Sequence, residues 1–227
     1  MRAITKTDDP EATAAFANSL KQIVGADHVT TDPDRVAFFS QDVYSRADYP
    51  ASLIVAPDNA QELVGVMLAA AENDTPVIAR GGGMSYTGGY LPAAPGAVMI
   101  DTQRMNRVLT IDENNMFVTV ETGCTWAALF EALSQKGLRT PFWGPLSGLS
   151  STIGGGLSQN NAFFGAGAYG PASESVTSLR VVLADGTLID TGSASTRNAL
   201  PFFRHYGPDM TGLFLGDNGA LGVKAEA

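Results

Sequence analysis

The chain has 227 residues, 44% of them hydrophobic and 16% charged, which is enough to bury a sizeable core in one large domain or two close subdomains. Its formal net charge is −9 and it has no run of Lys or Arg, which argues against nucleic acid or an anionic membrane surface as a partner. No apolar stretch approaches the length of a signal-peptide core or a membrane span, so we expect a cytoplasmic protein.

The first predicted element is a helix over residues 10–24. Asp9 is its expected N-cap, Pro10 fits its first turn and Gly25 marks its end. Apolar residues recur within it at helical spacing, namely Phe16, Leu20, Ile23 and Val24. One face of this helix should therefore be buried.

The segment after this helix is expected to be irregular and to pack on the main body through aromatic side chains (Phe38, Phe39 and Tyr44). We interpret residues 1–48 as an N-terminal helical segment that packs on a domain formed by residues 49–227. No repeat, linker or low-complexity tract divides the chain further.

A strand–helix–strand unit is predicted next. Strands are expected over residues 53–56 and 77–79, and the helix between them begins at Asn59, which stands three residues before Glu62 as in a capping box. The predicted buried stripe of the helix is Leu63, Val64, Met67, Leu68 and Ala71. Such a unit favours parallel pairing and a ligand at the carboxyl ends of the strands.

The remainder of the chain reads as short strands and one helix. Thr125 is the expected N-cap of the helix, whose apolar face is Trp126, Leu129, Phe130 and Leu133 and which Gly137 closes. Asp185 and Gly186 predict a hairpin turn. Strands are predicted over residues 97–101, 116–122, 176–183 and 187–190, with another beginning within residues 219–227. A parallel first half and an antiparallel second half predict an α+β fold with two subdomains.

Two segments, residues 81–89 and 144–170, hold five and eight of the chain's 25 glycines. Glycine permits positive φ and lets a ligand approach the backbone closely, and successive N–H groups in such a loop can bind an anion. Tight turns between strands are the alternative. Three consecutive glycines occur twice beside hydroxyl residues, which is more freedom than turns need, so we favour a ligand cradle.

The segment from Gly165 to Gly170 matches the dinucleotide pattern G-x-G-x-x-G. That pattern requires a strand before it and a helix opening at its end. Here a polar and aromatic stretch precedes it and Pro171 follows, so a nicotinamide-type Rossmann site is not favoured. No Gly-Lys-Ser/Thr phosphate-binding loop is present.

Several motifs together resemble the FAD-binding domain of the vanillyl-alcohol oxidase/p-cresol methylhydroxylase (PCMH) superfamily. The matching segments are residues 77–89 (VIARGGGMSYTGG), 99–108, 120–126 (VETGCTW), 151–156 (STIGGG), 181–186 (VVLADG) and 207–223. The likeness runs in order over residues 35–227 and is strongest to the branch of glycolate oxidase flavin subunits and D-lactate dehydrogenases. It implies a PCMH-type α+β fold with a small parallel βαβ subdomain and a mixed or antiparallel sheet with helices.

The resemblance also implies which residues bind FAD. The backbone of the first segment would wrap the diphosphate, at Gly81, Gly82, Gly83, Met84, Ser85 and Gly88. The second segment would hold the diphosphate and ribityl chain from the opposite side, at Ser150, Ser151, Gly154 and Gly155. Asn160 would lie near the flavin, Tyr169 is a further cofactor position, and the main chain of Val223 would meet the adenine or ribose.

The sequence departs from covalent members of this family. Many carry a histidine where this chain has Met84, and bicovalent members have a cysteine in the second segment, which here has none. The FAD is therefore expected to be non-covalent. Cys124 is interpreted as a buried structural thiol, and His205 as a satisfied or exposed histidine rather than a base. With one cysteine and two histidines, we expect no disulfide and no metal.

The resemblance implies an oxidoreductase that passes a hydride from a small-molecule 2-hydroxy acid or alcohol to FAD. The family's C-terminal substrate domain is expected to be absent from this chain, so the catalytic base stays unknown. One alternative is a stand-alone flavin-binding or electron-transfer subunit whose partner chain carries the substrate site. A third alternative is a cofactor-free fragment. A fourth is an NADPH-dependent enzyme similar to enolpyruvyl reductases, but the loop sequences do not favour this one.

Overall fold

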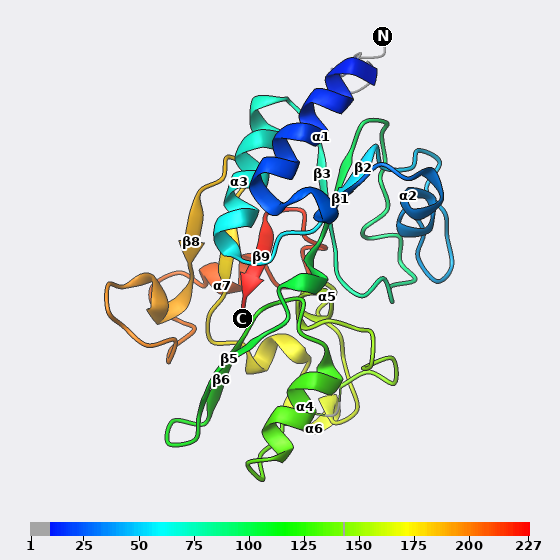
Figure 1. Ribbon diagram of the computed structural model, residues 1–227. Coiled ribbons are helices and arrows are strands. Elements are labelled where there is room, and N and C mark those ends of the chain that lie inside the picture. Colours follow the sequence, from blue (N-terminus) through cyan, green and yellow to red (C-terminus); the bar gives the residue numbers. More distant parts are fainter. Residues whose placement is uncertain (1–9, 143) are drawn as a thin grey trace.

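The computed structural model describes residues 10–142 and 144–227 (Figure 1). The predicted cap Asp9 lies outside the described residues. Helix α1 (Pro10–Val24) is confirmed, and Gly25 ends it with a φ of 90°. In the described part of the chain, no helix is both long enough and apolar enough to cross a bilayer.

A four-stranded sheet forms the first half of the fold. Its order is β1 (Val29–Thr30), β2 (Leu53–Val55), β4 (Val98–Asp101) and β3 (Val77–Arg80). Strands β2, β4 and β3 are parallel, and β1 is antiparallel to β2. The predicted strand–helix–strand unit is therefore confirmed, with β4 inserted between its two strands.

Helices cover both faces of this sheet. Alternate strand residues point to opposite faces, so Leu53 and Val55 pack with α1 and with α3 (Ala60–Glu72). Ile54 packs on the other face with α2 (Pro33–Phe39). Figure 1 shows α1 and α3 side by side and α2 across the sheet. The boundary placed between residues 48 and 49 stays a prediction.

Helix α2 corrects the expectation of an irregular segment. Asp32 caps it by accepting a hydrogen bond from the Arg35 N–H at 2.8 Å, and Pro33 occupies its first turn. The helix is only seven residues long, so it shows no clear periodicity. Phe39 is buried as predicted, whereas Phe38 and Tyr44 are largely exposed.

Helix α3 begins as predicted but buries a different stripe. The Asn59 side chain accepts from the Glu62 N–H at 2.9 Å, while the Glu62 carboxylate accepts from the Asp58 N–H instead of that of Asn59. Leu68 and Ala71 are exposed, and the buried residues are Ala60, Leu63, Val66, Met67, Ala69 and Ala70. The stripe is wider because α3 packs on both α1 and the sheet.

The second half is antiparallel, as predicted. A three-stranded sheet has the order β8 (Leu188–Asp190), β7 (Arg180–Val182) and β9 (Val223–Glu226), and the turn of its hairpin contains Gly186 at a φ of 79°. A separate hairpin pairs β5 (Val108–Asp112), which was not predicted, with β6 (Phe117–Val120). The α+β prediction is confirmed.

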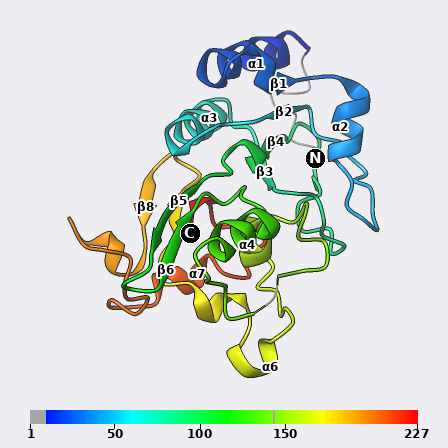
Figure 2. The same cartoon turned by 60° about the horizontal axis from the view of Figure 1, so that its bottom comes forward.

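Short helices complete this half. They are α4 (Trp126–Ser134), α5 (Ile153–Ser158), α6 (Ala166–Tyr169) and α7 (Met210–Leu213). Thr125 caps α4 as predicted, although Phe130 is 42% exposed rather than buried. The run Gly154–Gly156, expected as a loop, is helical because Thr152 caps α5. Figure 1 shows α4 and the β5–β6 hairpin in the lower part of the molecule, away from α1, and in the turned view of Figure 2 α4 lies near the centre.

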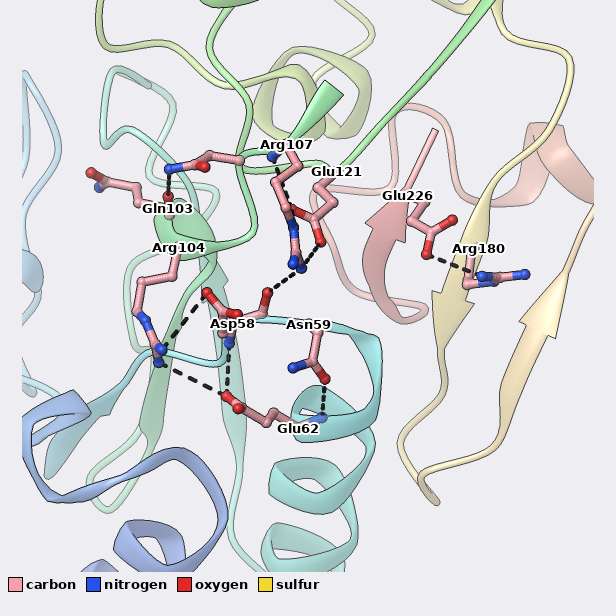
Figure 3. A network of polar contacts seen from close by, with 10 residues as sticks. Asp58, Asn59, Glu62, Gln103, Arg104, Arg107, Glu121, Arg180 and Glu226 are labelled. Carbon is pink, nitrogen blue, oxygen red and sulfur yellow. Dashed lines mark hydrogen bonds and ion pairs between the residues drawn. The ribbon is translucent and has the colours of Figure 1, made fainter. Parts of the chain in front are cut away.

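Ion pairs connect the two halves (Figure 3). Arg107 donates to the buried Glu121 carboxylate through Nε and Nη2, and Nη2 also donates to the Asp58 carbonyl at 2.8 Å. Arg104 lies within 4 Å of both Asp58 and Glu62. The start of α3 is thereby tied to the start of β5 and to the end of β6.

Candidate cofactor site

A cavity of about 530 Å³ lies between the two halves, at the carboxyl end of β3. Both glycine-rich segments and the start of β9 line it. A cavity of this size and position is typical of a cofactor or small-molecule site. The predicted site residues that line it are Gly81, Gly82, Gly83, Met84, Ser85, Ser151, Gly154, Gly155 and Val223.

The first glycine segment supplies free hydrogen-bond donors. The backbone N–H groups of residues 82–85 donate to no other residue in the described ranges 10–142 and 144–227. Gly83 takes a φ of 68°, which turns the chain sharply after β3. Consecutive free N–H groups in a concave loop are suited to bind an anion such as a diphosphate.

The two glycine segments also pack directly on each other. A Cβ on Gly81 would stand 2.1 Å from the Thr152 Oγ1, and one on Gly82 would stand 1.8 Å from the Ser150 carbonyl oxygen. Both distances are far inside van der Waals contact. These two glycines are therefore needed for packing between the segments, in addition to any approach by a ligand.

The second glycine-rich segment leaves space in the cavity, but the N–H groups of Gly154 and Gly155 are not free to bind a ligand. The Gly154 N–H donates to the Thr122 carbonyl at 2.8 Å, and the Gly155 N–H donates to the Thr152 Oγ1 at 3.3 Å. Both N–H groups are therefore already used, one by the Thr122 carbonyl and one by the N-cap of α5. Without side chains, the glycines still leave room for a ligand next to the helix.

Four predicted site residues do not line the cavity. The Gly88 N–H donates to the Asp42 carboxylate at 2.7 Å, and Ser150 faces solvent. The Asn160 side chain accepts from the Ser173 N–H at 3.4 Å. Tyr169 is half exposed, at the end of α6. Their assignment to the cofactor stays a prediction.

The cavity has polar residues that the sequence prediction missed. Gln159 donates to Asn218 at 2.5 Å and accepts from the Thr87 hydroxyl at 3.1 Å, so three distant segments meet there. Lys224 forms an ion pair with Asp217 at 2.6 Å, and both side chains are buried. Burial lowers the pKa of Lys224, and the Asp217 carboxylate opposes that shift. No sequence motif marked these pairs.

Arg80 is the other missed residue. It stands directly before the glycines in the sequence, so its position was the available signal. Its guanidinium is buried and lies 4.2 Å from the Phe39 ring centroid and 5.5 Å from that of Tyr90. Its Nε has no hydrogen-bond partner in the part of the chain that the structure describes.

Acid–base groups are scarce in the cavity. None of its described lining residues is His, Asp or Glu. His205 is exposed and lies elsewhere, and the described residues contain no cluster of three or more potential metal ligands. Cys124 is buried as predicted, and burial raises its pKa to about 11. The cavity can therefore bind and orient a polar, anionic ligand, but it offers no evident proton acceptor.

Comparison with known proteins decides what that ligand is. A family model described as "FAD binding domain" matches residues 51–192. The chain belongs to this family of FAD-binding domains. The cofactor is FAD, and the cavity fits it, because free N–H groups and a buried cation are available for the diphosphate and the glycines leave space beside the backbone.

Curated relatives extend the family assignment. The chain is 33% identical to the glycolate oxidase subunit GlcD of Bacillus subtilis over 189 residues, which covers 83% of this chain and 38% of the relative. It is 27% identical over 227 residues to D-lactate dehydrogenase [cytochrome] 1 of Saccharomyces cerevisiae, covering 96% of this chain and 37% of that relative. The chain thus spans well under half the length of the curated relatives it matches.

Solved structures share the fold. The chain superposes on p-cresol methylhydroxylase with a TM-score of 0.81 at 19% identity, covering 96% of this chain and 43% of that one. It also superposes on alkyldihydroxyacetonephosphate synthase with a TM-score of 0.79 at 23% identity, covering 94% of this chain and 39% of that one. The predicted PCMH-type fold of an FAD-binding domain is confirmed.

Proposed function

We propose that this chain is the FAD-binding part of an oxidoreductase that oxidises a 2-hydroxy acid or another alcohol. The observation that carries the proposal is the row of free N–H groups over residues 82–85, which lines a cavity of about 530 Å³ in a chain of this family. The substrate class rests on relatives. They are named glycolate oxidase, D-lactate dehydrogenase and, in rice, probable D-2-hydroxyglutarate dehydrogenase.

The cofactor and this chain divide the chemistry. Bound FAD would supply a two-electron acceptor for the hydride of the carbon that bears the hydroxyl group. The chain's own residues hold and orient the cofactor. The N–H groups of residues 82–85 would bind the diphosphate, and the main chain of Val223 would meet the adenine or ribose.

Attachment of the cofactor is proposed to be non-covalent. Met84 lines the cavity where covalent members carry histidine, and it has no ring nitrogen to form such a bond. The chain's single thiol, Cys124, is buried outside the cavity. Location in the cytoplasm also stays a prediction, since some of the relatives are mitochondrial by name.

A second candidate function follows from the lack of a base. No described lining residue is His, Asp or Glu, and the Lys224 ammonium is paired with Asp217. The group that removes the substrate proton would then belong to a further domain or to a partner chain. Under this alternative the chain alone is a flavin-binding or electron-transfer unit.

Anaerobic reduction tests the proposal. The FAD-loaded chain is mixed with glycolate, D-lactate or D-2-hydroxyglutarate, and the visible flavin absorption is followed. Bleaching by a hydroxy acid would support the oxidoreductase reading for the chain itself. Bleaching by dithionite but by none of the acids would favour the second candidate, in which another domain or chain provides the base.

A further inference from the structure

The cavity holds one buried cation without a counter-ion. Its described lining residues include two cationic side chains, Arg80 and Lys224, and Lys224 is neutralised by Asp217. Arg80 forms no ion pair with any described carboxylate. Burying a charge without a partner is costly, so an uncompensated guanidinium needs a reason.

The position of Arg80 points to the ligand. A Cβ on Gly83 would stand 2.0 Å from one terminal nitrogen of Arg80 and 2.5 Å from its Cζ, so the guanidinium lies directly against this glycine. The same turn presents the free N–H groups of residues 82–85 to the cavity. Charge and backbone donors therefore meet at one place.

Arg80 makes few hydrogen bonds within the described part of the chain, where its polar contacts are the Gly81 carbonyl and Tyr90. One terminal nitrogen donates to the Gly81 carbonyl at 3.3 Å, which is a long contact. The Nε–H is buried without a partner in the described part of the chain. A guanidinium has five N–H donors in a planar fork that matches phosphate oxygens.

Neighbouring groups hold the guanidinium in place without neutralising it. It stacks on Phe39 from α2, and its Cζ lies 5.5 Å from the ring centroid of Tyr90, whose hydroxyl is within hydrogen-bond distance of the Gly83 and Gln41 carbonyls. The Asp101 carboxyl interacts electrostatically with Arg80 but forms no ion pair with it within 4 Å. Burial raises the pKa of Asp101, an effect that the Gln103 N–H and Arg80 only oppose.

We propose that Arg80 binds the diphosphate of FAD and supplies the positive charge for it, so that the cradle does not depend on backbone N–H groups alone. This inference rests on the proposed cofactor site. It assigns to Arg80 a role in selecting the dinucleotide, because riboflavin lacks the phosphates that this charge would recognise. It also explains why a chain with a net charge of −9 can hold a dianionic group.

The alternative is that Arg80 is structural and pins α2 to the sheet through Phe39. The two readings differ for the protein without FAD. If the charge serves the ligand, removing it relieves a buried, unpaired cation, and the FAD-free protein keeps or raises its melting temperature. If the stack is structural, the FAD-free protein melts at a lower temperature.

The test compares Arg80→Met and Arg80→Lys with the wild-type 227-residue chain. The matched control is Arg35→Met, which removes the same charge from another arginine beside Phe39. Arg35 is exposed, lies 5.7 Å from the ring centroid and does not line the cavity. Flavin fluorescence gives the dissociation constants for FAD and riboflavin, and thermal unfolding without flavin gives the melting temperatures.

We expect Arg80→Met to weaken FAD binding by at least about tenfold, with little change for riboflavin and no loss of melting temperature. Arg80→Lys should restore part of the affinity, and Arg35→Met should bind FAD as the wild type does. An unchanged FAD affinity in Arg80→Met would overturn the inference while the proposed function stands. The inference would also be overturned if Arg80→Met without flavin melted at a lower temperature and bound FAD and riboflavin more weakly by the same factor. A wild-type chain that takes up no FAD would overturn both.

Discussion

Gly82 lies against the backbone of Ser150, so closely that an added Cβ would stand 1.8 Å from the Ser150 carbonyl oxygen. This contact joins the two glycine-rich segments, which are far apart in the sequence. It closes one side of the cavity, and it makes the shape of the cofactor site depend on the packing of the protein. A change at Gly82 should therefore affect both stability and cofactor binding.

Gly82→Ala should lower the free energy of unfolding by about 1–3 kcal/mol, because the backbone of one segment must move to admit the methyl group. The same movement should weaken FAD binding. Gly167→Ala is the matched control, since Gly167 has no atom within 4 Å of an added Cβ. Urea unfolding and FAD titration measure both effects, and equal behaviour of the two variants would contradict the packing argument.

Asp217→Asn should be strongly destabilising at neutral pH, by about 3–5 kcal/mol, because it leaves the Lys224 ammonium buried without its partner. Replacing both residues, as in Asp217→Asn with Lys224→Met, should recover most of this loss, because no buried charge is then left unpaired. A double variant as unstable as the single one would show that the pair is not the cause.

The same variant should show a distinct dependence on pH. Burial lowers the pKa of Lys224 from 10.5, and loss of Asp217 should lower it further. At pH values between the lowered pKa of Lys224 in the folded protein and its pKa in the unfolded chain, the unfolded state binds more protons. The free energy of unfolding therefore rises with pH in this range. The deficit of Asp217→Asn relative to the wild type should therefore shrink as the pH approaches 10.5. Denaturation at several pH values would test this, and a constant deficit would contradict it.

Glu121→Gln should weaken the connection between the two halves. Its carboxylate accepts from the Arg107 N–H and Nε–H, both at 2.9 Å, and it is nearly fully buried. We expect a loss of about 1.5–3 kcal/mol in unfolding free energy. Glu113→Gln removes an exposed partner of Lys136 and should cost at most about 1 kcal/mol. Similar losses in the two variants would argue against a special role for the buried pair.

Cys124 should resist thiol reagents in the folded protein. Burial raises its pKa to about 11, so at pH 8 the thiol is protonated as well as inaccessible. The Ellman reagent should label it slowly in buffer and rapidly in denaturing urea. Fast labelling of the folded chain would show that this region opens readily.

The sequence predicted the order of the elements well where caps and periodicity were clear. Asn59 and Thr125 cap α3 and α4 as expected, and Gly186 forms the hairpin turn. It failed for α2, because a seven-residue helix gives little periodic signal. It also misjudged Leu68, which contacts the Gly186 turn of the other half, a neighbour that no local pattern could indicate.

Only part of the site could be predicted, because some of its contacts form only in the folded chain. Glycine clusters and the family resemblance located the two segments that line the cavity, including Gly82 and Gly155. Lys224 and Asp217 were missed because their pairing arises only when β9 folds against the cavity. Arg80 was visible in the motif, but its burial and its lack of a counter-ion are properties of the fold alone.

Non-covalent binding of FAD in this cavity can be measured with a visible absorption spectrum of the chain mixed with FAD and freed of excess flavin, repeated on the supernatant after acid precipitation. We expect flavin bands in the protein that pass completely to the supernatant. Bands that stay with the precipitate would contradict the non-covalent attachment inferred from Met84, and a chain that takes up no flavin would contradict the assignment of the cavity.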